Sequence, residues 1–179
     1  MKNNKVYRII LIALMSACCY VAFRFLKIRA PFTIHLGNVF CLLAALLLGG
    51  VEGGICGAIG MGIGDLLDPQ YVVTFPKTVI CKMIMALTAG YLAHRVFKIN
   101  ETKNKRDLFT TLLISVFVNV VFELAFGYVY YRFLLHTVND TFYIYLASKF
   151  VSLSVTSIIS LVVTFIIYFP IYNRIKSYI

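Results

Sequence analysis

The chain has 179 residues, of which 61% are hydrophobic and only 13% are charged, and its formal net charge is +10 at pH 7. Its apolar runs are too long and too numerous to be hidden inside one soluble core of this size, so the composition excludes an ordinary soluble domain and indicates a polytopic membrane protein. Most of the positive charge lies in short flanks beside apolar runs, where anionic lipid and topology explain it. We therefore expect a lipid membrane and no nucleic acid as partner.

The first apolar run, residues 6–26, begins among the three basic residues Lys2, Lys5 and Arg8 and superficially resembles a secretory signal. A signal peptide has a short apolar region before a small-residue cleavage site, whereas this run is long and is followed by further basic residues. We expect it to be retained as the first membrane helix.

Five more apolar runs follow, and each is expected to form a helix, because a chain crossing about 30 Å of hydrocarbon must satisfy its backbone within the segment. These runs cover residues 36–48, 51–67, 76–94, 108–133 and 145–168. The first two of them are short, so we expect them to be tilted, partly buried or sheltered by neighbours. No linker and no repeat divides the chain. The predicted fold class is thus an all-α integral membrane protein, a single domain over residues 1–179 with six transmembrane helices in one bundle.

Basic residues in the flanks predict the orientation. With six spans, the two termini and the linker between the fourth and fifth helices lie on one side, which the positive-inside rule makes cytoplasmic. The basic residues on that side are Lys2, Lys5, Arg8, Arg95, Lys98, Lys103, Lys105, Arg106, Arg174 and Lys176.

Small residues indicate close helix packing at two places. Gly53, Gly57, Gly60 and Gly64 share one face of the third expected helix, which suits internal packing. In the first helix, small residues around Ala13 and Ala17 fit either internal packing or a docking face for another subunit, and the sequence leaves both open. The five cysteines form no Cys-x-x-Cys pair and have no His at ligand spacing, so we expect neither a disulfide nor a metal site.

Polar residues within the spans carry the functional signal, because a charge near the bilayer centre costs roughly 2.5 to 3.5 kcal/mol and should face protein or water. Lys77 and Lys82 begin the fourth helix, and Lys149 and Ser152 begin the sixth. On the fifth helix, the α-helical period places Asn119, Glu123 and Tyr130 on one face.

Two interpretations of this polar group remain open. In one, Lys82 and Glu123 form a buried structural ion pair while Lys77 and Lys149 extend to the outer interface. In the other, the groups line a cavity that opens to the outside and binds a small polar solute. The second interpretation predicts that Glu123→Gln lowers ligand affinity and leaves folding intact.

Two outer loops support a cavity, residues 30–35 and 65–71. Each contains a rigidifying proline, and aromatic side chains such as Tyr71 supply a stacking surface for a flat ring. His35 and Asp65 add polar groups at the same side, although a lone interfacial histidine is more often structural.

Several motifs in the first half resemble the substrate-binding S component of energy-coupling factor (ECF) vitamin transporters, most closely the riboflavin, pyridoxine and hydroxymethylpyrimidine branch. They are Ile34-His35-Leu36-Gly37-Asn38, Leu43-Ala44-Ala45-Leu46-Leu47-Leu48-Gly49, Gly57-Ala58-Ile59-Gly60, Gly64-Asp65-Leu66-Leu67, Pro76-Lys77-Thr78 and Lys82. The fifth and sixth helices match more loosely.

The resemblance implies a high-affinity vitamin-binding subunit of an importer in the bacterial plasma membrane. It implies binding at the outer face, with pyridoxine, hydroxymethylpyrimidine or a similar small ring compound as the best guess. It further implies docking through Ala13 and Ala17 onto a transmembrane coupling subunit driven by two ATPase subunits. The chain has no Gly-x-x-x-x-Gly-Lys-Ser/Thr motif, which agrees with ATP being used by those partners and no cofactor being bound here.

The chain departs from relatives in the outer loop Asp68-Pro69-Gln70-Tyr71 and in Lys149. Outside the cytoplasmic flanks, basic residues outnumber acidic ones, which favours a neutral or anionic solute over a cation such as thiamine. The residues counted are Arg24, Lys27, Arg29, Lys77, Lys82, Arg132 and Lys149 against Asp65, Asp68, Glu123 and Asp140.

Two other functions were weighed. A small integral-membrane enzyme could use Glu123, Asp65 or His35 as acid or base, but the sequence offers no paired carboxylates and no His-rich constellation, so we expect no catalytic residues. A ligand-free membrane assembly subunit would explain the small-residue faces but not the outer polar group.

Overall fold

The structure is a computed structural model that describes residues 4–28, 33–136 and 140–176. Its helices are α1 (Asn4–Arg24), α2 (Gly37–Leu47), α3 (Gly50–Leu66), α4 (Phe75–Tyr91), α5 (Ile99–Thr102), α6 (Lys105–Val129) and α7 (Asp140–Ile175). Two short strands, β1 (Lys27–Ile28) and β2 (Ile34–His35), pair antiparallel, with Lys27 opposite His35. A 3₁₀ turn (Val72–Thr74) precedes α4, and π-helical turns end α4 (Leu92–Val96) and α6 (Tyr130–Leu134).

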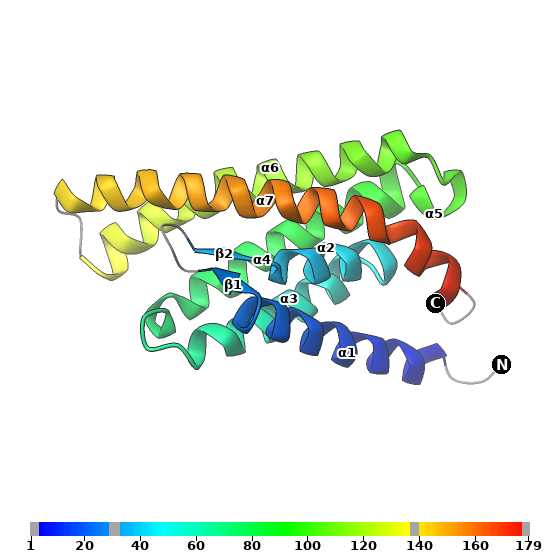
Figure 1. The fold of residues 1–179 in the computed structure, drawn as a ribbon, viewed down its shortest axis with the longest axis horizontal. Coiled ribbons are helices and arrows are strands. Elements are labelled where there is room, and N and C mark those ends of the chain that lie inside the picture. Colours follow the sequence, from blue (N-terminus) through cyan, green and yellow to red (C-terminus); the bar gives the residue numbers. More distant parts are fainter. Residues whose placement is uncertain (1–3, 29–32, 137–139, 177–179) are drawn as a thin grey trace.

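The helices lie side by side along the long axis of the molecule (Figure 1). The start of α1, the end of α7 and the short α5 are at one end. The α3–α4 connection, the end of the π-helical turn after α6 and the start of α7 are at the other end, and the β-hairpin lies on that side of the bundle. The hairpin therefore stands near the α3–α4 connection although the two are separated in sequence by α2 and α3.

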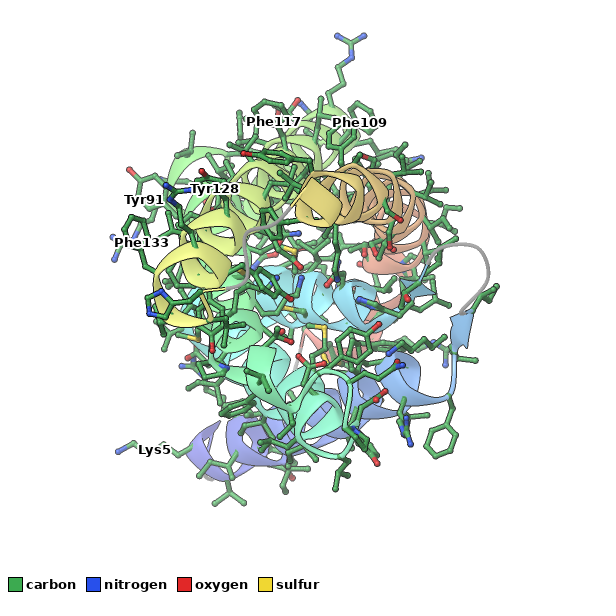
Figure 2. The ribbon with its side chains drawn as sticks, turned by 90° about the vertical axis from the view of Figure 1, so that its left-hand side faces the viewer. Lys5, Tyr91, Phe109, Phe117, Tyr128 and Phe133 are labelled. Atoms are coloured by element: carbon green, nitrogen blue, oxygen red, sulfur yellow. The ribbon has the colours of Figure 1, made fainter. Side chains whose placement is uncertain are left out.

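Four helical segments are long and apolar enough to cross a membrane: Lys5–Arg24, Val72–Val96, Lys105–Leu134 and Leu146–Ile175. Large apolar side chains on them point away from the bundle, as Figure 2 shows for Phe109, Phe117 and Phe133, the last two about two-thirds exposed. Such a surface suits lipid rather than water. The predicted helical, multi-pass membrane character is thus confirmed, while a count of six crossings remains a prediction.

The remaining two large helices are shorter, and α2 has only 11 residues. All but one of them are buried, because α2 packs against α1, α3, α4 and α7. A helix that is surrounded by protein does not contact the hydrocarbon of the bilayer. It therefore need not be as long as the bilayer is thick. The expected shelter of this short segment is confirmed.

The glycine face of α3 makes the close contacts expected of it. A Cβ atom on Gly53 would lie 2.5 Å from the Cα of Ala45 in α2, and one on Gly60 would lie 2.5 Å from the carbonyl oxygen of Ser16 in α1. Only glycine lets both neighbouring backbones approach this closely. The face therefore packs inward, against two helices at once.

Some boundaries differ from the sequence-based expectation. The helix α7 has 36 residues and extends beyond the predicted residues 145–168 at both ends. At 1.5 Å per residue it is about 54 Å long, well beyond the hydrocarbon thickness of a bilayer. Hydropathy marks the apolar part of a helix, so the polar turns at its ends were missed, as were the β-hairpin and the π-helical turns.

Candidate functional site

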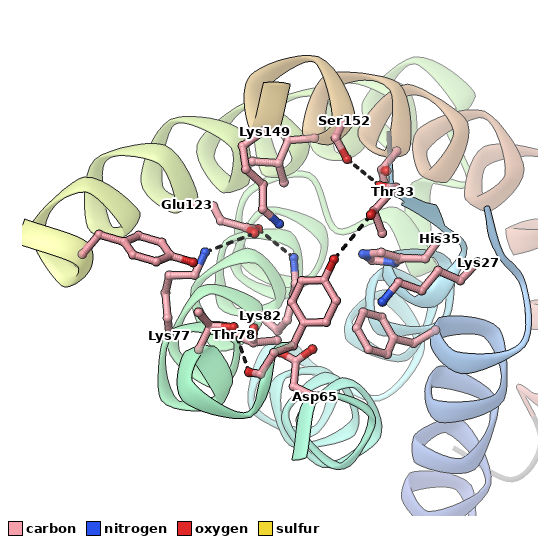
Figure 3. A pocket seen from close by; sticks show the side chains of 16 residues that line it. Lys27, Thr33, His35, Asp65, Lys77, Thr78, Lys82, Glu123, Lys149 and Ser152 are labelled. Atoms are coloured by element: carbon pink, nitrogen blue, oxygen red, sulfur yellow. Dashed lines mark hydrogen bonds and ion pairs between the residues drawn. The ribbon is translucent and has the colours of Figure 1, made fainter. Parts of the chain in front are cut away.

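A small cavity, partly open to solvent, lies among α1, the β-hairpin, the α3–α4 connection, α4, α6 and α7 (Figure 3). Eight of the ten substrate-site residues predicted from the sequence line it. These are His35, Asp65, Tyr71, Lys77, Lys82, Glu123, Lys149 and Ser152.

Glu123 is the centre of the charge network in this cavity. Its Oε2 atom lies 3.0 Å from Nζ of Lys82, and its Oε1 atom lies 3.7 Å from Nζ of Lys77. Both lysines are at most 5% exposed. One carboxylate thus forms ion pairs with two buried ammonium groups, which belong to two different turns of α4.

The structure therefore contains a feature of each of the two interpretations of the polar group. The predicted Lys82–Glu123 ion pair is present, and it lines a cavity. The expectation that Lys77 extends to the outer interface is wrong, because its ammonium turns inward to Glu123 and is buried.

Asn119 and Tyr130 do not line the cavity. Asn119 lies below it, one turn of α6 from Glu123, and its Oδ1 atom is 3.5 Å from Nζ of Lys82. Tyr130 donates its hydroxyl to the carbonyl oxygen of Val73 at 2.7 Å, and Tyr131 faces the cavity instead. The α-helical hydrogen bonding of α6 continues to Tyr130, whose backbone N–H donates to the carbonyl oxygen of Phe126, and a π-helical turn begins at this residue.

Tyr71 covers the cavity from the α3–α4 connection. Its ring centroid is 4.2 Å from Nζ of Lys27, and its hydroxyl is 3.4 Å from Oγ1 of Thr33. Behind it, Arg24 and Lys27 lie 3.5 Å and 3.7 Å from Oδ2 of Asp68. Cation–π and ionic contacts therefore join the loop that carries Tyr71 to the end of α1 and to β1.

The β-hairpin is also joined to α7, because the Ser152 hydroxyl donates to the carbonyl oxygen of Thr33. Residues 29–32 of the outer loop expected over 30–35 lie outside the described residues, as do Arg29 and the side chain of Asp140. The hairpin adds Lys27 and Thr33 to the cavity wall. Thr33 belongs to the loop that was expected to cover a cavity, but neither residue was expected in its wall, because nothing in the local sequence pattern shows that these strands pair and contact α7.

His35 stands in β2 with its ring in a T-shaped contact with Phe23, 4.7 Å between centroids. Burial and the nearby ammonium of Lys82 lower the pKa of His35 to about 3, so its imidazole is neutral at physiological pH. Its Nδ1 atom has no hydrogen-bond partner among the residues that the structure describes. This atom can serve a bound ligand as a neutral donor or acceptor.

Other wall residues were absent from the sequence-based set. They are Phe23, Thr74, Thr78, Tyr131, Leu153 and Thr156. Thr156 follows Lys149 and Ser152 at the helical spacing that the sequence shows for one face of α7. Within the described parts of the chain, no group of three or more His, Cys, Asp or Glu side chains could hold a metal ion.

Ala13 and Ala17 lie far from this cavity, on the exposed face of α1. Together with Ser16 of α1 and Gly60 of α3 they line an open apolar groove. Isoleucines and a tyrosine complete its walls: Ile9, Ile12, Tyr20, Ile59 and Ile63. Of the two roles left open for these alanines, the surface placement favours docking over internal packing.

Comparison with known proteins gives a family and a fold. A family model described as ECF-type riboflavin transporter, S component, matches residues 3–177. A solved structure of the S component of a bacterial ECF transporter superposes with a TM-score of 0.68, over 94% of this chain and 97% of that chain, at 20% sequence identity. No curated protein matches the sequence.

Proposed function

Since the chain belongs to the family of ECF-type riboflavin transporter S components, we propose that it captures a small water-soluble vitamin or related micronutrient in the cavity beneath Tyr71. Members of this family are substrate-binding subunits of ECF transporters and not enzymes, and so is this chain. The observation that carries the specific proposal is the meeting of the eight predicted polar side chains in one cavity at an end of the bundle.

The proposed topology places that cavity at the outer face of a bacterial plasma membrane. The start of α1, the end of α7 and the basic connection containing α5 lie at the opposite end of the bundle (Figure 1). Excess basic charge favours the cytoplasm for that end, which gives cytoplasmic termini. With α2 and α3 counted as crossings, the chain forms one six-helix membrane domain.

The proposed substrate is a small ring compound of the pyridoxine or hydroxymethylpyrimidine kind. Tyr71 and Phe23 offer aromatic surface to a flat ring, while His35, Asp65 and Ser152 offer hydrogen bonds at its edges. The lysines make a cationic solute unfavourable, which argues against thiamine. The family description mentions riboflavin, which remains one member of the group of candidates.

Delivery of the substrate is proposed to need a transmembrane coupling subunit and two ATPase subunits. The open groove around Ala13 and Ala17 is a suitable docking surface, because small residues let a partner helix approach closely. ATP would be used by the partner subunits, and this chain would need no cofactor of its own.

Isothermal titration of the detergent-purified protein tests the substrate proposal. The panel contains riboflavin, pyridoxine, hydroxymethylpyrimidine, the phosphate esters of these three, and thiamine. We expect one ring compound to bind at one per chain with a Kd of about 1 μM or tighter, and thiamine to bind at least about tenfold more weakly. Tight binding of thiamine alone would contradict the charge argument. Failure of every compound would favour a ligand-free assembly role.

A further inference from the structure

The cavity and its rim hold more positive than negative charge. Five cations gather there against three carboxylates: Arg24, Lys27, Lys77, Lys82 and Lys149 against Asp65, Asp68 and Glu123. Two of the carboxylates are shared, since Asp68 serves Arg24 and Lys27 while Glu123 serves Lys77 and Lys82. Among the described residues, two positive charges are therefore left without a matching negative charge.

Lys149 carries part of this surplus. It makes no ion pair or hydrogen bond with any residue in the described ranges, and its recorded contact is with the Tyr71 ring, 5.8 Å from Nζ to the centroid. Figure 3 shows its side chain directed from α7 into the cavity, toward the region of Glu123. Because Glu123 already serves two lysines, it cannot neutralise a third cation fully.

A second, much smaller hollow adjoins the first between α6 and α7. Lys77, Glu123 and Lys149 line both cavities. Beyond these charged groups the wall is mostly apolar, and it is formed by Leu124, Gly127, Tyr131, Leu146 and Leu153. Lys77 and Lys149 therefore stand where the two spaces meet, within reach of a ligand in the larger one.

Cations held away from water are costly unless an anion or several acceptors compensate them. This cost is greater in a membrane protein, where intramembrane charges are usually paired or mark a substrate path. We propose that the substrate carries an anionic group, a carboxylate or a phosphate, that binds between Lys149 and Lys77 while its ring lies under Tyr71. This proposal rests on the proposed function and narrows it from a neutral or anionic solute to an anion.

Thermal unfolding with inorganic phosphate and acetate as probes tests the anion site without knowledge of the substrate. A thiol-reactive dye can report unfolding, because Cys19, Cys41, Cys56 and Cys81 are at most 1% exposed in the folded protein. At constant ionic strength set with sodium chloride, each probe should raise the midpoint saturably in the wild type. Lys149→Gln should lose most of this rise, and Lys105→Gln, an exposed lysine beside α5, should retain it.

Lys149→Gln should also fold, because Lys149 pairs with no described group, and without probe its midpoint should equal or exceed that of the wild type. A lower midpoint for Lys149→Gln than for the wild type would contradict the inference that the cavity holds surplus positive charge. No saturable rise in the wild type, or an equal rise in both variants, would overturn the anion site.

Matched ligand pairs separate failure of this inference from failure of the proposed function. Each neutral compound in the titration panel is compared with its phosphate ester, and Lys149→Gln should weaken binding of the ester about tenfold or more. If only a neutral compound binds at one per chain, the anion class is overturned and the proposed function stands. If the probes bind saturably but no vitamin does, the anion site stands and the vitamin-binding function fails.

Discussion

Replacing Glu123 by Gln is expected to lower the thermal midpoint of the ligand-free protein by about 10 °C. The substitution removes the one carboxylate that serves both Lys77 and Lys82, and breaking a buried ion pair from one side typically costs about 3–5 kcal/mol. In a domain of 150–250 residues, each kcal/mol shifts the midpoint by about 2–4 °C. The sequence alone suggested that folding would remain intact, and the double pairing is the reason to expect otherwise.

The control is the double variant Lys82→Met/Glu123→Gln, which removes both members of the closer pair. Its midpoint should recover part of the loss, because the closer pair is replaced by uncharged groups of similar size while Lys77 still lacks its carboxylate. Phosphate should raise the midpoint of Glu123→Gln by more than that of the wild type, since an anion replaces part of the lost negative charge. An unchanged midpoint in the single variant would show that Glu123 is not the centre of the network.

The double substitution Ala13→Leu/Ala17→Leu is expected to abolish uptake while leaving ligand binding intact. Both alanines are exposed on α1 and line the groove with Gly60, so two leucines would fill the space that a partner helix needs. In cells that also produce the coupling subunit and both ATPases, ATP-dependent uptake should fall at least about tenfold, while the Kd of the purified protein should change less than about twofold.

Ala125→Leu is the matched control, because Ala125 is an exposed alanine of α6 outside the groove. It should retain uptake at the wild-type level. Preserved uptake in the α1 double variant would refute the docking surface. An equal loss in Ala125→Leu would point to a general effect of added bulk on the membrane domain.

The polar part of the site could be predicted because charged side chains in membrane helices are unfavourable in contact with lipid. Lys77, Lys82 and Glu123 had to face protein or water, and a Lys82–Glu123 ion pair was one of the two interpretations that the sequence left open. The structure brings them within ion-pair distance. Tyr130 does not line the cavity, because its hydroxyl donates to the carbonyl oxygen of Val73, a contact that helical periodicity cannot predict.

The contribution of the β-hairpin could not be predicted from the sequence. Lys27 and Thr33 reach the cavity only because two-residue strands pair and Ser152 of α7 holds the Thr33 carbonyl. These are contacts between segments far apart in the chain, and strands this short leave no alternating pattern to recognise. The ion pairs of Asp68 could not be predicted either, because they form only where the fold brings Arg24 and Lys27 close to this carboxylate.

Hydropathy also could not separate a buried helix from a spanning one. The segment containing α2 is apolar on all sides because it lies at the centre of the bundle, whereas α6 is apolar over much of its surface because it faces outward. Both read as apolar runs in the sequence. Only the packing of α1, α3, α4 and α7 around α2 distinguishes them.

The most direct test of vitamin capture is mass spectrometry of small molecules released from the detergent-purified protein. A tight binder often retains its ligand through purification, and the chain has no Trp for a simple fluorescence titration. The account predicts one ring compound, carrying a carboxylate or phosphate, at close to one per chain in the wild type and depleted in Lys149→Gln. A stoichiometric cationic compound, or a wild-type protein that releases nothing and binds no member of the titration panel, would contradict it.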